Sequence, residues 1–115
     1  MSYKRGDVIL IRFPNSDLKT YKKRPALIVQ ADGLATNLQQ TIVALITSNT
    51  ARVGPTRVPI SKNDQDGKAI GLTADSVVVT DNLATVLERE IDKSIGHCLA
   101  MRLVDRALKQ TLGLN

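Results

Sequence analysis

Two polar segments that each adjoin an apolar run carry the side chains best suited to chemistry. Arg24 and Pro25 precede the apolar residues 26–29, and Thr47 follows a second apolar run at residues 41–46. A guanidinium is a planar fork of donors that stays charged and matches phosphate oxygens, whereas a threonine hydroxyl adds a compact donor and acceptor on a stiff stem. If the two runs are neighbouring strands, Arg24 and Thr47 meet at their ends. The sequence therefore predicts an anion site, with a phosphate as its ligand.

The charge of the chain supports an anionic partner. The 115 residues include 16 Lys and Arg against 11 Asp and Glu, which gives a formal charge of +5. This balance favours either a polyanion or an acidic protein that covers the same face. With 43% hydrophobic residues, the chain suffices for one domain over residues 1–115 with a modest core.

Cysteine and histidine usage argues against a disulfide framework and a metal site. Cys98 is the single cysteine and His97 the single histidine, and neither a CxxC motif nor paired histidine spacing occurs. We therefore expect no metal or other cofactor, and a reducing cytoplasm as the compartment. The longest apolar runs are strand-sized and none follows the basic N-terminus, so we expect neither an export signal nor a membrane span.

Hydrophobic patterning predicts a mainly β domain with a C-terminal helix. Runs rich in Val, Ile and Leu predict strands at residues 8–13, 26–30, 41–46, 57–60 and 76–80, with a less regular run at 84–91. Residues 14–23 and 62–68 predict exposed loops, and residues 81 and 82 are expected to break a strand. From residue 99 to 112 the apolar residues share one helical stripe, which Gly113 is placed to end. Short strands with one terminal helix indicate a small, mostly antiparallel barrel or sandwich.

Several short motifs follow one another over nearly the whole chain. They are Gly6-Asp7-Val8, Arg24-Pro25-Ala26-Leu27-Ile28-Val29, Ile46-Thr47-Ser48-Asn49, Gly71-Leu72 with Asp75-Ser76-Val77, Thr80-Asp81-Asn82, and Leu112-Gly113-Leu114 after the helix. In this order and spacing they resemble the MazF/PemK toxins of bacterial toxin–antitoxin pairs. The resemblance implies an SH3-like barrel of the CcdB/PemK type, a homodimer, and metal-independent endoribonuclease activity on single-stranded RNA. It also implies a cognate antitoxin with an acidic C-terminal segment that lies across the RNA groove.

The candidate catalytic residues fit such a cleavage. Attack of a ribose 2′-hydroxyl on the adjacent phosphorus needs a proton acceptor, a donor for the leaving 5′-oxygen and stabilisation of the charge that develops. Arg24 suits the stabiliser and donor roles, and Thr47 either holds a phosphate oxygen or orients the 2′-hydroxyl. The base is Asp81 or a water molecule. Some members of the resembling family carry an Arg two residues before this Asp, but Val79 occupies that position here, so an acid–base pair of that kind does not transfer.

Further residues of the same segments are candidates for RNA binding. Cations beside a phosphate site raise RNA affinity and make it sensitive to salt, and an aromatic ring can stack on a base. The RNA-binding candidates are Lys19, Tyr21, Lys22, Lys23, Ser48, Asn49, Arg52 and Arg57.

Simpler interpretations stand beside these. Arg24 can form a structural ion pair with Asp7 or Asp81, the hydroxyl of Thr47 can satisfy backbone groups at a strand end, and Asp75 suits a turn or a cap. Two other functions also fit the fold class. A gyrase poison of the CcdB type is one, although that branch ends in a Trp-containing C-terminus and this chain has no Trp. A non-catalytic RNA-binding SH3-like module is the other.

Overall fold

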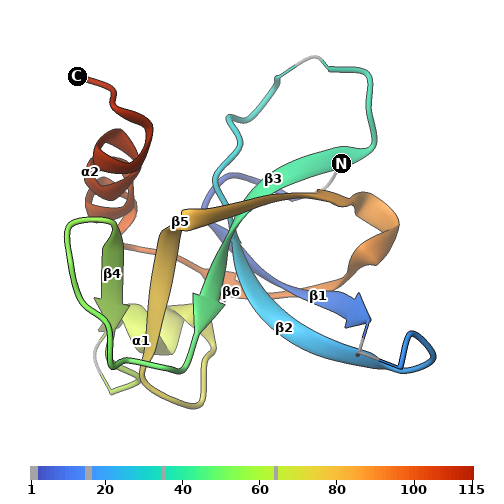
Figure 1. Ribbon diagram of the computed structural model, residues 1–115, viewed down its shortest axis with the longest axis horizontal. Helices are drawn as coiled ribbons and strands as arrows, with labels where there is room; N and C mark the ends of the chain where they lie inside the picture. Colours follow the sequence, from blue (N-terminus) through green and yellow to red (C-terminus); the bar gives the residue numbers. More distant parts are fainter. Residues whose placement is uncertain (1–2, 15–16, 35, 64) are drawn as a thin grey trace.

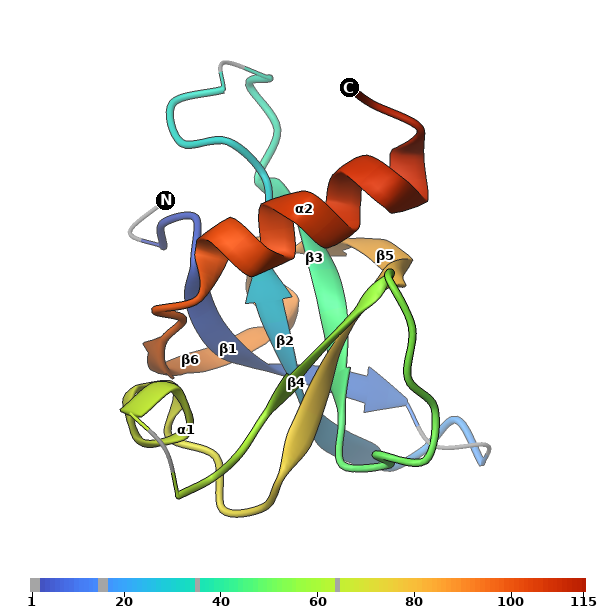
Figure 2. The same cartoon turned by 90° about the vertical axis from the view of Figure 1, so that its left-hand side faces the viewer.

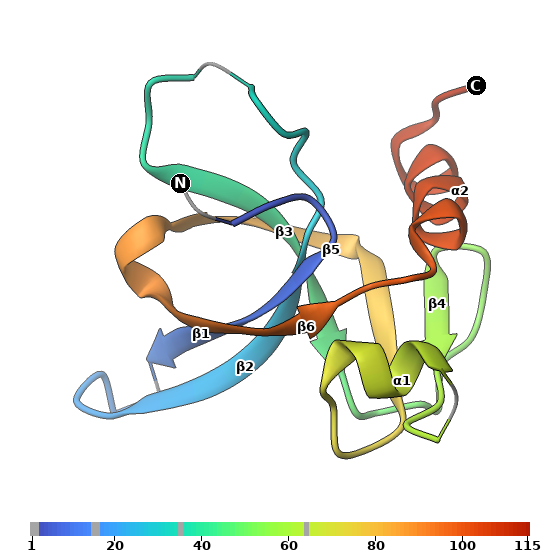
Figure 3. The ribbon, with the colours of Figure 1, turned by 180° about the vertical axis from the view of Figure 1, so that it is seen from behind.

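The described part of the chain folds into one curled antiparallel sheet flanked by helices. The computed structural model describes residues 3–14, 17–34, 36–63 and 65–115. In these residues six strands follow the order β4-β5-β3-β2-β1-β6, and the sheet curls back on itself (Figures 1 and 3). The elements are β1 (Asp7–Pro14), β2 (Tyr21–Ile28), β3 (Gln40–Thr47), β4 (Arg57–Ile60), α1 (Gln65–Ile70), β5 (Ser76–Leu87), the 3-10 turn η1 (Glu88–Glu90), β6 (Ile91–His97) and α2 (Met101–Leu112).

Both faces of the central strands are apolar, and each face has its own core. Successive side chains of a strand point to opposite faces, so the fully buried neighbours Val8 and Ile9 of β1 need cover on both sides. On one face, α2 supplies this cover by lying across the sheet (Figure 2); the buried residues there are Val8, Leu27, Ala44, Ile46, Val58, Ile60, Val78, Cys98, Val104 and Ala107. The curl of the sheet encloses the second set, which is Ile9, Ile11, Ala26, Ile28, Val43, Val86 and Ile91. Complete burial of such a side chain contributes roughly 1.5–3 kcal/mol.

The C-terminal helix is confirmed, and polar contacts fix both of its ends. Gly113 ends α2 in the left-handed conformation, with φ of 69°, as its missing Cβ permits. Near that end, the hydroxyl of Thr111 lies 2.9 Å from the buried hydroxyl of Thr80 on β5. Nearer the start, Asp105 accepts a 2.6 Å hydrogen bond from Arg5. These contacts tie the helix to the strands that it covers.

Three predictions about secondary structure are wrong, each for a local reason. Residues 21–23 belong to β2 and not to a loop, because they pair with residues 12–14. Their side chains are exposed, so the sequence lacks the apolar pattern by which a strand is predicted. Residues 65–70 form α1, where Gly67 packs so closely on the Ser61 carbonyl oxygen that any side chain would collide with it. Residues 81 and 82 do not end β5, and a separate strand, β6, follows η1. Residues 15, 16 and 64 of the expected loops lie outside the described residues.

In the part of the chain that the structure describes, no helix has the length and apolar content needed to cross a bilayer. Nor does the same part of the chain contain a group of three or more His, Cys, Asp or Glu side chains placed to hold a metal ion.

Candidate phosphate-binding site

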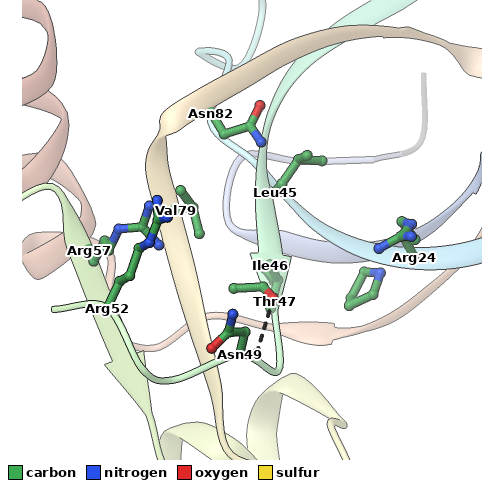
Figure 4. A pocket seen from close by; sticks show the side chains of 10 residues that line it. Arg24, Leu45, Ile46, Thr47, Asn49, Arg52, Arg57, Val79 and Asn82 are labelled. Atoms are coloured by element: carbon green, nitrogen blue, oxygen red, sulfur yellow. Dashed lines mark hydrogen bonds between the residues drawn. The ribbon is translucent and has the colours of Figure 1, made fainter.

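Arg24 and Thr47 line the same hollow, where the pairing of β2 with β3 ends. The pairing of β2 with β3 joins Ala26 to Leu45, and continuing this register would place Arg24 opposite Thr47. The strands separate at this point instead, and both side chains line the space that opens there (Figure 4). Thr47 ends β3 as predicted, but Arg24 lies within β2 and not at its end; the two residues line the same hollow.

Two hollows adjoin this pair of residues. Both are lined by the same four residues, Arg24, Pro25, Ile46 and Thr47, which form a shared wall between them. The first hollow, of about 290 Å³, is completed by Leu45, Asn49, Arg52, Arg57, Val79 and Asn82. The second hollow, of about 390 Å³, is completed by Lys22, Lys23, Ser48, Leu72, Thr73, Ala74 and Ser76.

The hydroxyl of Thr47 is oriented by its own loop. The backbone N–H of Asn49 donates to Thr47 Oγ1 over 3.1 Å, and Asn49 Oδ1 in turn accepts the N–H of Ala51 over 3.1 Å. This is the backbone contact that the simpler interpretation of Thr47 foresaw. This bond takes one of the two lone pairs of the oxygen, so Thr47 keeps its hydroxyl hydrogen and one lone pair for a ligand.

The guanidinium of Arg24 is exposed and is not held by either carboxylate proposed for it. Asp7 lies 3.1 Å from His97 Nδ1, and Asp81 lies 3.7 Å from the guanidinium of Arg57. The structural ion pair considered for Arg24 is therefore wrong. Among the described residues, no hydrogen bond or ion pair occupies its donors, so they can meet an external anion.

A bulge in β5 shapes the opposite wall of the first hollow. The β3 neighbours Ala44 and Leu45 pair with Leu83 and Val79, so residues 80–82 bulge out of the ladder. Bulges of this kind re-aim side chains and are frequent beside active sites. Here the bulge directs Asn82 into the first hollow (Figure 4).

Asp81 reaches the site only through its partner. Its carboxylate, 45% exposed, is paired with Arg57, whose side chain is 17% exposed and lines the first hollow. Arg57 comes from β4, where it stands opposite Val79 of β5. A guanidinium thus accompanies Asp81 although residue 79 is a valine.

The structure brings most of the predicted RNA-binding residues to the hollows. Arg52, Arg57 and Asn49 line the first, and Lys22, Lys23 and Ser48 line the second. The ammonium of Lys23 also lies 3.1 Å from Asp92, and this hydrogen bond is the main reason why the pKa of Asp92 is below its usual value.

Lys19 and Tyr21 line neither hollow. Tyr21 borders a separate hollow of about 520 Å³ with Arg12, Arg89 and Glu90. Lys19 lies in a turn where its backbone N–H donates to Asp17, and this bond, followed by that from Thr20, lowers the pKa of the Asp17 carboxyl. Both residues lie on the arm formed by β1, β2 and their connection.

Several lining residues were not expected from the sequence. Asn82 and the hydroxyls of Thr73 and Ser76 all lie in or next to quoted motifs, and this was the only signal that could have found them. Asp75 accepts the backbone N–H of Lys62 over 2.9 Å, so it joins two turns, as its interpretation as a turn residue predicted.

Comparison with known proteins identifies the family. The model of the PemK-like, MazF-like toxins of type II toxin–antitoxin systems matches residues 4–112. Endoribonuclease MazF6 of Mycobacterium tuberculosis is 33% identical over 107 residues, which cover 88% of each chain. The solved Mycobacterium tuberculosis toxin MazF-mt6 matches with a TM-score of 0.73 and 27% identity, over 95% of this chain and 98% of that one. A mycobacterial endoribonuclease in complex with its cognate antitoxin matches with a TM-score of 0.74 and 28% identity, over 99% and 98%. The resemblance found in the motifs is thus confirmed, and the chain belongs to the PemK-like, MazF-like toxins of type II toxin–antitoxin systems.

Proposed function

We propose that this toxin is an endoribonuclease that cleaves single-stranded RNA without a metal ion, with the scissile phosphate seated on the wall between the two hollows. The observation that carries the proposal is the exposed guanidinium of Arg24, free of partners in the described residues, which lines the same hollow as the oriented hydroxyl of Thr47. Its relatives in the same family are named endoribonucleases.

Each group has one role in this reaction. The 2′-oxygen forms a bond to phosphorus while the bond to the 5′-oxygen breaks, so the products carry a cyclic 2′,3′-phosphate and a 5′-hydroxyl. Arg24 neutralises the charge that develops on the phosphate and hydrogen-bonds to the leaving 5′-oxygen, which takes its proton from water. Thr47 donates its hydroxyl hydrogen to a non-bridging oxygen, while the backbone N–H of Asn49 holds Oγ1 in position.

Asp81 completes the set as proton acceptor. Its carboxylate lies behind Arg57 rather than on the wall of a hollow, so it takes the proton of the 2′-hydroxyl through one water molecule. Arg57 and Arg52 then attract the RNA backbone on that side, and Lys22 does so on the other.

The same cationic surface is the proposed docking site of the antitoxin. A relative is solved with its cognate antitoxin, and a chain of charge +5 with uncompensated arginines suits a partner that brings an acidic segment. We propose such a cognate antitoxin, a homodimeric toxin, and the cytoplasm as the place where the two meet.

The test is cleavage of single-stranded RNA by purified protein in excess EDTA. We expect cuts that leave cyclic phosphate and 5′-hydroxyl ends; Thr47→Ser should retain them, and Thr47→Val should lose about 10²- to 10³-fold in rate through loss of one oriented donor. Intact RNA at every sequence tested would contradict the proposal. RNA retention without cleavage would instead indicate the binding module, and inhibition of gyrase would indicate the gyrase poison.

A further inference from the structure

We propose that the first hollow, hereafter the amide hollow, seats a nucleobase next to the scissile phosphate and selects a keto base, uracil or guanine, through Asn82. The amide hollow is the one completed by Leu45, Asn49, Arg52, Arg57, Val79 and Asn82. The inference rests on the proposed function, because it places RNA at Arg24 and Thr47.

Position is the first argument. The amide hollow shares its wall with the phosphate-binding pair, so a phosphate held there has a nucleotide on each side and one hollow for each. The strands β2 and β3 part at this wall, which leaves the hollow open to an unpaired base. A single-stranded base is accessible in this way, because its Watson–Crick edge is free.

The lining of the amide hollow suits a base, whereas that of the second hollow suits a backbone. Leu45 and Val79 give the amide hollow an apolar wall, and Asn49 and Asn82 add two amides, which can match the edge of a base (Figure 4). The polar side chains beyond the shared wall in the second hollow are hydroxyls and ammonium groups, which contact ribose and phosphate without regard to sequence.

A surplus of donors sets the preference for a keto base. Asn49 Oδ1 already accepts the N–H of Ala51, so this amide presents its NH₂ group to the hollow. Arg52 adds further donors, and the carboxylate of Asp81 is paired with Arg57. The NH₂ group of Asn82 can donate to the carbonyl oxygen of uracil or guanine, while its Oδ1 accepts the ring N–H beside that oxygen. Uracil and guanine offer carbonyl oxygens to these donors, whereas the amino groups of adenine and cytosine require acceptors that the lining supplies sparsely.

Asn82 is the residue to substitute, because its place in the fold tolerates a different side chain. It is exposed and lies in the bulge of β5, where the ladder to β3 is interrupted, and among the described residues its side chain has no hydrogen-bond partner that a substitution would orphan. Asn82→Ala removes the amide. Asn82→Asp keeps the shape and replaces the donor by an acceptor.

Binding tests the inference separately from catalysis. Fluorescently labelled oligo(U) and oligo(A) of equal length are titrated with wild type, Asn82→Ala, Asn82→Asp and the control Asn63→Ala, an exposed asparagine of the turn before α1. We expect wild type and the control to bind oligo(U) about tenfold more tightly than oligo(A), Asn82→Ala to bind both about equally, and Asn82→Asp to favour oligo(A) relative to wild type. Equal affinities in wild type, or a preference that Asn82→Ala leaves unchanged, would overturn the inference whether or not the protein cuts RNA.

Cleavage gives the second measurement. In a random RNA pool with EDTA, wild type should cut next to uracil or guanine at one flanking position, and Asn82→Ala should lose that preference while still cutting. A wild-type preference for adenine or cytosine at both positions that flank the cut would also overturn the inference. Failure of wild type to cut any RNA would count against the proposed function alone.

Discussion

Arg5 and Arg24 have the same side chain, but among the described residues only the guanidinium of Arg5 is bound by other protein groups. Arg5 donates to Asp105 over 2.6 Å and to the carbonyl oxygen of Val29 over 2.9 Å, and its side chain is 28% exposed. Arg24 is exposed at the wall between two hollows with no acceptor among the described residues. The first guanidinium joins the N-terminal turn, the end of β2 and α2. The second has all of its donors left for an external anion.

The remaining cations extend this contrast. Asp92 lies 2.9 Å from Arg12 and 3.1 Å from Lys23, so one carboxylate holds two cations of the β1–β2 arm. Arg57 stands between the two classes, because it is paired with Asp81 and also lines the amide hollow. The cations that make up the formal charge of +5 therefore fall into two groups. Those paired with protein groups (tied cations) stabilise the fold, and those without a partner in the described residues (untied cations) remain available to RNA.

Removing the untied guanidinium should have the largest effect. We expect Arg24→Ala to lower kcat by about 10²- to 10³-fold, because one preorganised donor group is lost from the transition state. The melting temperature should stay nearly unchanged, since no protein acceptor in the described residues is orphaned. Cleavage of a short labelled RNA and thermal melting measure the two quantities.

Arg24→Lys separates charge from geometry. It keeps the charge and loses the fork, so it should recover only part of the rate. Wild-type cleavage by Arg24→Ala, or a melting temperature that falls with the rate, would remove the distinction between the two classes of arginine.

Removing the tied guanidinium should have the converse effect. Arg5→Ala breaks two hydrogen bonds that join separate elements, so it should lower the free energy of unfolding by about 1–2 kcal/mol, the solvent exposure of the pair having been discounted. The cleavage rate at a temperature where the variant is folded should not change. Chemical denaturation measures the loss of unfolding free energy. The matched control is Arg102→Ala, at an exposed position of α2, the helix that contains Asp105. Equal stability of the two variants would show that the Arg5 contacts are not what holds the helix start.

The sequence predicted the elements whose signal is local. Residues 57–60 form a strand as expected, and those of α2 follow the helical stripe, because burial imposes a period that can be read directly. By contrast β6 places Asp92 and other polar residues at the edge of the sheet, where no alternation is required. Its pairing with β1 depends on contacts far apart in the chain.

The residues of the candidate site also divide into those that the sequence predicted and those that it did not. Arg24 and Thr47 could be paired from the sequence because each adjoins an apolar run, although β2 begins before Arg24 and only its pairing with β3 ends there. Asn82 was not, because its direction depends on a shift in register between β3 and β5 that turns an expected strand break into a bulge. Tyr21 was misplaced for a related reason: it lies within the β1–β2 hairpin and borders another hollow, which only the paired strands reveal.

The smallest effect should come from the carboxylate that ties Arg12 and Lys23. The pKa of Asp92 is lowered from its ordinary value of 3.8, chiefly by the hydrogen bond from Lys23. A depressed pKa in the folded state means that ionised Asp92 stabilises the protein above pH 3.8, and that this contribution is lost as the pH falls through the folded pKa. Wild type should therefore melt slightly above Asp92→Asn at pH 7, and the gap should close when both are measured well below pH 3.8. Added salt should also narrow the gap at pH 7, since these pairs lie near the surface. A gap that persists in acid would show that the shape of residue 92, rather than its charge, supports the arm.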